Sequence, residues 1–150
     1  MTLGERRTRE VRAPVDRVWS VVEGVGGPAG WYAFTRLWAV RAGLDRVVGG
    51  PGMRGRPDRP LRIGDVVDFW VVEAIVPGRS LNLRAQMRMP GTARMALTLT
   101  PAGACAALEQ VITFEPRGVA GLAYWYGQLP AHRVVFAAML RGMVRAAERR

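Results

Sequence analysis

The sequence contains no lysine: all 22 basic residues are arginine, and against 12 acidic residues they give a formal charge of +10 over 150 residues. The absence of lysine excludes Schiff-base catalysis by a side-chain amine. The single cysteine, Cys105, excludes an intrachain disulfide and any thiolate-rich zinc site. With one histidine and no clustered carboxylates, the sequence predicts neither a metal site nor a cofactor.

Long apolar runs are also missing. The N-terminal residues include several arginines where a signal peptide would need an apolar run. The longest uncharged stretch, Gly118 to Ala131, is well short of the roughly 20 apolar residues that span a bilayer. We therefore expect a reduced, cytoplasmic protein with no membrane span, folded as a single domain over residues 1–150.

The positive charge has two interpretations. It can indicate a nucleic-acid or acidic-membrane partner. It can also follow from coding bias, because arginine, alanine, glycine, proline and valine dominate, as GC-rich codons would produce. The arginines are scattered rather than gathered in one block, so we favour the compositional interpretation.

Apolar periodicity predicts the elements. A first strand spans Glu5 to Arg12, and a helix follows Pro14, with one apolar face made by Val15, Val18, Trp19 and Val22. A second helix runs from about Trp31 to Val48 with Leu37, Val40, Leu44 and Val47 on one side. From Asp65 the period changes to two, which predicts an antiparallel meander of strands at 66–76, 80–89, 92–100 and 108–115.

The remaining residues, 117 to about 148, are predicted to be helical with an interruption near Gly127 and Pro130. His132 then falls in the first turn of the helix after the break. It points into the middle of an apolar arc made by Val135, Phe136, Met139, Met143 and Ala146. The meander needs a cover for its apolar face, and this helix supplies one, so the fold class is α+β.

Several segments resemble a known superfamily. The entry Val11-x-Ala13-Pro14 followed by Val18-Trp19 resembles the helix-grip fold of the START and pollen-allergen-like (SRPBCC) superfamily. Further segments resemble a bacterial family of unknown function within that superfamily. They are Gly30-Trp31-Tyr32, Gly49-Gly50-Pro51-Gly52, Gly64-Asp65, Asp68-Phe69-Trp70, Phe114-Glu115-Pro116-Arg117-Gly118, Tyr124-Trp125-Tyr126 and Pro130-x-His132. The resemblance implies a curved sheet around a long C-terminal helix and a cavity for small apolar molecules. Some members carry the domain behind an NAD(P)-binding domain.

Candidate ligand-binding residues come from the inward faces of the meander and the last helix. The apolar ones are Met87, Met95, Leu97, Ile112, Phe114, Phe136, Met139 and Met143. Each by itself is explained by core packing, but four methionines suit irregular contents. Trp70, Trp125 and Tyr126 are expected to line the pocket as donors, while Trp19 and Trp38 belong to helix packing.

Three polar residues stand where the pattern expects apolar ones: Asp68, Gln110 and His132. They form either an internal network between helix and sheet or the polar tip of a ligand pocket, with His132 as acid or base. Three functions stay open. The first is binding of a small apolar molecule, with cyclase-, isomerase- or lyase-like chemistry. The second is docking onto an NAD(P)-binding partner or a second copy. The third is nucleic-acid binding through Arg84, Arg88 and Arg94 on the outer sheet face.

Overall fold

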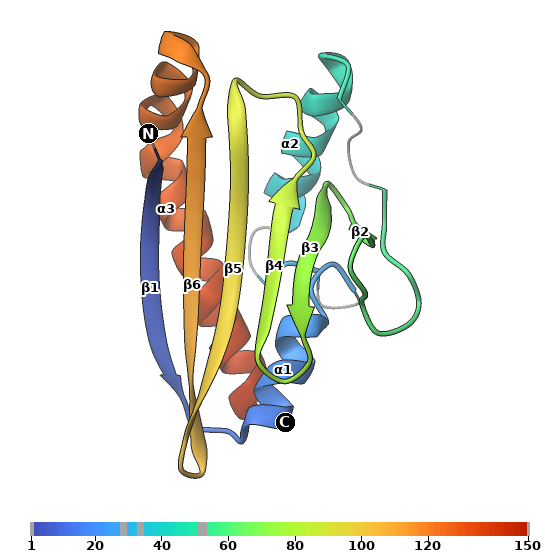
Figure 1. The fold of residues 1–150 in the computed structure, drawn as a ribbon, viewed down its shortest axis with the longest axis vertical. Coiled ribbons are helices and arrows are strands. Elements are labelled where there is room, and N and C mark those ends of the chain that lie inside the picture. Colours follow the sequence, from blue (N-terminus) through green and yellow to red (C-terminus); the bar gives the residue numbers. More distant parts are fainter. Residues whose placement is uncertain (1, 28–29, 33–34, 51–53, 150) are drawn as a thin grey trace.

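The computed structural model describes residues 2–27, 30–32, 35–50 and 54–149. Its strands are β1 (Leu3–Val11), β2 (Val66–Val67), β3 (Trp70–Val76), β4 (Ser80–Ala85), β5 (Gly91–Ala102) and β6 (Cys105–Pro116). Its helices are α1 (Val15–Glu23), α2 (Thr35–Val47) and α3 (Gly118–Arg149). The six strands form one curved antiparallel sheet in the order β1-β6-β5-β4-β3-β2, and the helices lie behind it in Figure 1. The predicted α+β helix-grip architecture is confirmed.

The β5–β6 hairpin forms the centre of the sheet. Its register places Met95 opposite Ile112 and Leu97 opposite Gln110, so that alternate side chains of both strands face the helices. These inward side chains are almost completely buried. Leu83 lies opposite Met95 on the neighbouring strand, and both belong to one buried cluster with Phe136 of α3.

The strand expected at 66–76 is instead a hairpin of β2 and β3. Val67 pairs with Trp70, and the chain reverses at Asp68, whose φ is +57°. Asp tolerates this left-handed conformation better than most residues. Its carboxylate also accepts a hydrogen bond of 2.8 Å from the indole of Trp31, far away in sequence. The contact with Trp31 helps to fix this reversal. The turn was missed in the sequence because apolar residues stand on both sides of Asp68, as in one continuous strand.

The next predicted strand, 80–89, ends early. β4 stops at Ala85, and the backbone N–H of Gln86 donates to Phe69 O, in the turn before the neighbouring strand β3, at 2.6 Å. The backbone N–H of Arg88 donates to the buried carboxylate of Asp45 on α2, at 2.5 Å. The guanidinium of Arg88 lies near Gly49, just after α2, so Arg88 is not part of the outer row with Arg84 and the segment after β4 turns toward α2.

The second helix also differs from the prediction. α2 begins at Thr35, and Trp31 instead lies in a turn, fully buried against Phe69 with ring centroids 6.2 Å apart. The apolar side expected to be buried is exposed: Val40, Leu44 and Val47 are 59%, 58% and 83% exposed. The side chains of Leu37 and Trp38 lie outside the described part, and so do residues 51–53 of the glycine-rich segment.

The predicted interruption of the last helix is wrong. α3 is continuous through Gly127 and Pro130. A proline inside a helix removes one hydrogen bond and crowds the preceding turn. Pro130 lies on the exposed side of α3. The opposite side of the helix is buried both before and after Pro130 and packs against the sheet. His132 is therefore in the middle of a long helix, not in a first turn.

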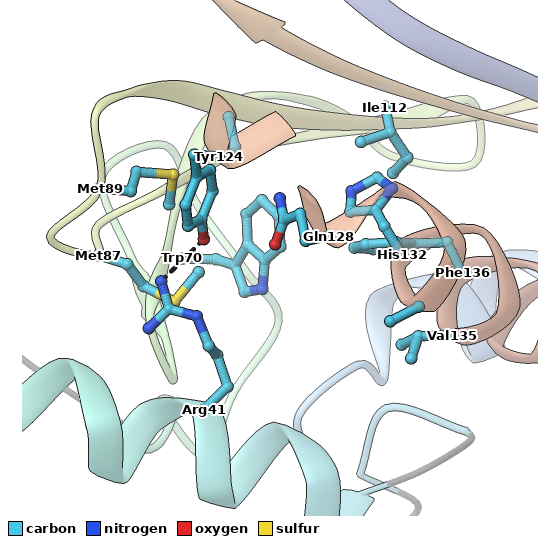
Figure 2. A pocket seen from close by; sticks show the side chains of 12 residues that line it. Arg41, Trp70, Met87, Met89, Ile112, Tyr124, Gln128, His132, Val135 and Phe136 are labelled. Atoms are coloured by element: carbon cyan, nitrogen blue, oxygen red, sulfur yellow. Dashed lines mark hydrogen bonds between the residues drawn. The ribbon is translucent and has the colours of Figure 1, made fainter. Parts of the chain in front are cut away.

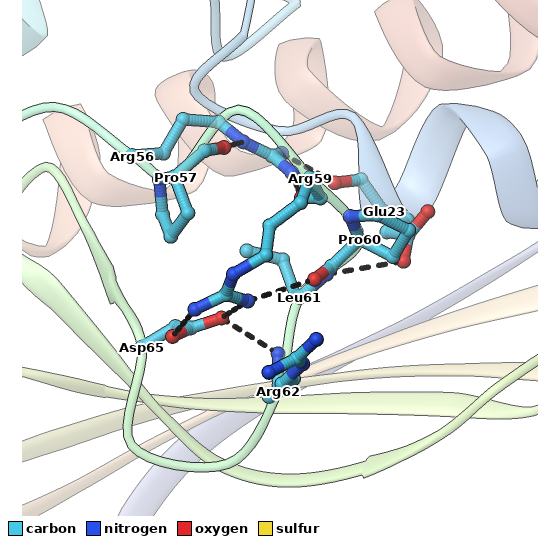
Figure 3. Close-up of polar contacts among 8 residues, drawn as sticks. All are labelled: Glu23, Arg56, Pro57, Arg59, Pro60, Leu61, Arg62 and Asp65. Atoms are coloured by element: carbon cyan, nitrogen blue, oxygen red, sulfur yellow. Dashed lines mark hydrogen bonds and ion pairs between the residues drawn. The ribbon is translucent and has the colours of Figure 1, made fainter.

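Arginines hold the connector between α2 and β2, which Figure 3 shows. Arg56 Nη1 donates to the carbonyls of Glu23 at 2.6 Å and Val25 at 3.0 Å, at the C-terminus of α1, where helical carbonyls lack partners. Arg59 forms a bidentate pair with Asp65 at 2.8 and 2.9 Å, and Arg59 lowers the pKa of the Asp65 carboxyl. These contacts order a segment whose glycines and prolines form no regular element.

Candidate ligand-binding site

A pocket of about 220 Å³ lies between the sheet, α2 and α3, partly open to solvent (Figure 2). It is larger than an engineered apolar cavity of roughly 150 Å³ that accommodates benzene. The lining is mainly apolar. It consists of Arg41, Trp70, Met87, Met89, Ala93, Ile112, Tyr124, Gln128, Ala131, His132, Val135 and Phe136.

Most of the pocket wall consists of buried apolar side chains. Trp70 from β3, Ile112 from β6 and Phe136 from α3 are each at most 5% exposed, so packing holds them in place. Met87 and Met89, on the segment that leaves the sheet after β4, close one side of the pocket. Methionine adapts its shape to irregular contents, so this side is the most adaptable part of the wall.

Four polar side chains enter this apolar lining. Arg41 from α2 donates a hydrogen bond of 3.0 Å from Nη2 to Tyr124 Oη. Gln128 lies one turn further along α3, and within the described chain its amide has no hydrogen-bond partner. His132 follows one turn after Gln128. A few polar groups in an apolar concavity are typical of a site that orients a small molecule.

His132 is held between aromatic rings. Its imidazole lies 4.5 Å from the Phe136 ring and 5.1 Å from the Trp125 ring, measured between centroids. Its side chain is 11% exposed, and burial lowers the pKa of His132 below its usual value of 6.5. The nearby Glu5 carboxylate raises that pKa but does not outweigh the burial. His132 is therefore neutral at pH 7, with one nitrogen able to donate and the other to accept.

Glu5 is a site residue that the sequence pattern did not indicate. Its side chain is 9% exposed, and Oε2 lies 3.5 Å from His132 Nδ1, which is long for a hydrogen bond. It also accepts from Arg7 at 2.6 Å and from Arg133 at 3.2 Å. Because β1 directs Glu5 and Arg7 toward α3, an anion and a cation occupy its inward face. The one sequence signal is the two-residue period of β1. Leu3, Glu5 and Arg7 occupy alternate positions and therefore lie on the same face of the strand.

Five of the predicted residues line the pocket: Trp70, Met87, Ile112, His132 and Phe136. The others are placed elsewhere. Met95, Leu97, Met139 and Met143 are core residues, each at most 1% exposed. Phe114 and Trp125 stack on each other with centroids 5.7 Å apart, in a cluster that includes Met89 and adjoins the pocket.

Asp68 and Gln110 do not converge on His132 as a shared polar tip. Asp68 accepts from the Trp31 indole and fixes the β2–β3 turn. Gln110, fully buried, accepts from Arg7 at 3.2 Å and contacts the Met139 sulfur at 3.8 Å. Gln110 thus joins the network of Glu5 and Arg7, and the internal-network interpretation describes it better.

Tyr126 is a correction: it is 61% exposed and does not line the pocket, whereas Tyr124 does. The lining residues that the sequence interpretation missed are Arg41, Met89, Ala93, Tyr124, Gln128, Ala131 and Val135. Tyr124, Gln128, Ala131 and Val135 follow one another at the i, i+4, i+7 and i+11 spacing of a single helix face. That signal becomes visible only when the helix is taken as continuous across Pro130.

The outer sheet face carries paired charges. Arg84 and Arg94, opposite each other on β4 and β5, both lie near Glu73 at 3.4 and 3.0 Å. Arg94 also pairs with Glu115 at 3.3 Å. These carboxylates neutralise much of the row, which disfavours a phosphate-binding face.

The described residues contain neither a cluster of metal ligands nor a membrane-spanning helix. No three His, Cys, Asp or Glu side chains among them come together as a metal site would require. Among the helices of this described part, none has the length and apolar character needed to cross a bilayer.

Comparison with solved structures gives the fold. The Zhui aromatase/cyclase from Streptomyces sp. R1128 is similar over 100% of this chain and 96% of that one, with a TM-score of 0.64 and 19% identity. Truncated norcoclaurine synthase from Thalictrum flavum matches over 97% and 92%, with a TM-score of 0.56 and 9% identity. Ara h 8.0201 matches over 99% and 96%, at 0.53 and 10%. All three have the helix-grip fold, and this fold is confirmed for the chain.

At these identities the similarity concerns the fold alone. No curated protein matches the sequence. One protein family does, and its description is "Protein of unknown function (DUF2867)". The match extends over residues 1–139, most of the chain and nearly all of the fold, including β1, the complete sheet and the part of α3 that lines the pocket. The chain therefore belongs to the DUF2867 family.

Proposed function

We propose that the protein binds a small, mainly apolar molecule in the pocket between the sheet and α3. The observation that carries this proposal is the pocket of about 220 Å³, with fixed apolar walls and few polar groups. Trp70, Ile112 and Phe136 offer apolar and aromatic contact surface. Their burial means that a ligand meets a preformed surface, which reduces the entropic cost of binding.

The proposal includes a role for His132. A neutral imidazole inside an apolar pocket can orient a ligand carbonyl or hydroxyl and exchange a proton with it. Glu5 stands behind Nδ1, where a carboxylate favours the tautomer that carries its hydrogen on that nitrogen. Proton exchange of this kind is what a cyclase or isomerase reaction needs. Two solved structures with this fold are named as aromatase/cyclases, Zhui and the di-domain StfQ, which supports the proposal.

Native mass spectrometry of the purified protein tests the binding function. We expect a co-purifying small molecule, released on denaturation, in the wild type. Ala131 lines the pocket but is exposed at its rim, so Ala131→Phe should obstruct the mouth without overpacking the core. The matched control is Ala123→Phe, at an exposed position of α3 outside the lining. Equal loading of both variants would contradict the proposed site.

A second candidate is docking onto an NAD(P)-binding partner protein or a second copy. One observation favours it: Val40, Leu44 and Val47 form an exposed apolar stripe on α2. Light scattering during size-exclusion chromatography tests the second-copy form, because Leu44→Glu should dissociate a dimer made through this stripe. A wild type that is monomeric over a wide concentration range would exclude that form.

A further inference from the structure

Arg41 occupies an unusual position at the mouth of the pocket. It is half-buried, it reaches from α2 toward α3, and its guanidinium group lies beneath the Tyr124 hydroxyl in Figure 2. Among the described lining residues it is the one with a permanent charge. Its single hydrogen bond within the described chain is the one from Nη2 to Tyr124 Oη, at 3.0 Å. A guanidinium has five N–H donors, so most of them stay available.

Tyr124 provides a second donor at the same place. Its hydroxyl oxygen accepts from Arg41, so its own hydrogen is left to donate elsewhere. In the described part of the chain that hydrogen has no acceptor. The two groups come from different helices and meet at one edge of the pocket. Donors without an acceptor, one of them cationic, make a site for an anionic acceptor.

The protein's own carboxylates do not satisfy Arg41. Asp45, one turn along α2, is fully buried and accepts from the backbone of Arg88. Glu5, the carboxylate beside His132, is paired with Arg7 and Arg133. No ion pair of Arg41 occurs among the described residues. A half-buried guanidinium without an anion beside an apolar surface loses hydration without electrostatic compensation.

We infer that Arg41 and Tyr124 form an anion subsite, and that the ligand is an apolar carboxylic acid bound as its carboxylate. The inference rests on the proposed function, since it adds a charged end to the apolar molecule bound there. The planar fork of a guanidinium matches a carboxylate in bidentate geometry. The apolar body of the acid contacts Trp70 and Ile112, and its carboxylate stays at the rim, where solvent access limits the desolvation of the charge.

Calorimetric titration with two matched probes tests the subsite. The probes are 2-naphthoate and 2-naphthamide, which share an aromatic body and differ in the charge of one substituent. We expect the wild type to bind naphthoate about tenfold more tightly than naphthamide, because the carboxylate gains a charge-assisted hydrogen bond. Arg41→Gln should remove this preference and leave the naphthamide affinity within about twofold. Tyr124→Phe should reduce the preference in part.

The control is Arg84→Gln, which removes the same charge from the outer sheet face and should leave both affinities unchanged. Circular dichroism of each variant confirms that it is folded. If Arg41→Gln keeps the wild-type preference for naphthoate, or if the wild type binds both probes equally, the anion subsite is wrong and the apolar pocket stands. If neither probe binds the wild type, the proposed function and the subsite are both overturned.

Discussion

Glu5 Oε2 lies 3.5 Å from Nδ1 of His132, so the first strand places a carboxylate behind the imidazole that lines the pocket. The two residues are far apart in sequence and meet because β1 lies at the sheet edge nearest to α3 (Figure 1). The carboxylate is held by Arg7 and Arg133 and does not depend on His132. The imidazole can therefore be altered without leaving a buried charge unpaired.

The lowered pKa of His132 predicts how stability changes with pH. The unfolded chain takes up a proton near pH 6.5, whereas the folded protein does so only at lower pH. Protonation therefore favours the unfolded state between these two values, so the stability present above pH 6.5 is lost as pH falls toward the folded pKa. Urea unfolding from about pH 7 down to about pH 5 should show a steeper loss for the wild type than for His132→Phe. Parallel curves would contradict the lowered pKa.

His132→Phe should also separate binding from stability. The imidazole packs between Trp125 and Phe136, and phenylalanine preserves that packing, so at pH 7 we expect a melting temperature close to the wild-type value. Binding of the co-purifying molecule should be lost, because the phenyl ring can neither donate nor accept a hydrogen bond. Native mass spectrometry and thermal unfolding measure the two effects. A destabilised variant that still binds would give His132 a structural role only.

Glu5→Gln should destabilise the protein. The change leaves the largely buried Arg7 without its closest anion, at a cost of about 2 kcal/mol in the free energy of unfolding. The matched control is Glu109→Gln on the neighbouring strand, where an exposed pair with Arg6 has a separation of 3.7 Å. That change should alter stability by less than about 0.5 kcal/mol. Equal effects in urea unfolding would show that Glu5 is not part of a buried network.

Asp68 should prove structural. Asp68→Ala removes the acceptor of the buried Trp31 N–H and places alanine at a φ of +57°, so we expect a loss of about 2–3 kcal/mol. Asp68→Asn keeps an acceptor oxygen and tolerates the left-handed backbone, so its cost should be much smaller. Denaturant unfolding followed by tryptophan fluorescence measures both. If the folded Asp68→Asn variant bound the ligand more weakly than the wild type, Asp68 would have to take part in ligand binding.

Two glycines of α3 should respond to alanine with opposite signs. A Cβ at Gly142 would overlap the backbone carbonyl of Tyr32, so Gly142→Ala must displace the helix and cost about 1–3 kcal/mol. A Cβ at Gly127 meets no atom within 4 Å, and alanine there should stabilise the helix by roughly 0.5–1 kcal/mol. Thermal unfolding of the two variants gives the comparison. A neutral Gly142→Ala would show that α3 does not pack closely against the Tyr32 turn.

The sequence by itself determined the order of the elements, the antiparallel sheet and the inward side of most strands. These features follow from local periods: period two in residues such as Met95 and Leu97, and the helical spacing of Phe136, Met139 and Met143. They need no knowledge of distant contacts, because each strand or helix must bury one face. For the same reason Ile112 and His132 were expected to face the interior, and both line the pocket.

Tertiary structure alone decided the reversal at Asp68, the inward charge of Glu5 and the meeting of Arg41 with Tyr124. Each depends on a partner far away in sequence: Trp31 for Asp68, His132 for Glu5, and another helix for Arg41. A local pattern specifies which face of an element is apolar, but not which polar group of another element will lie opposite. The polar groups of this pocket are placed by such long-range contacts, which form only in the folded chain.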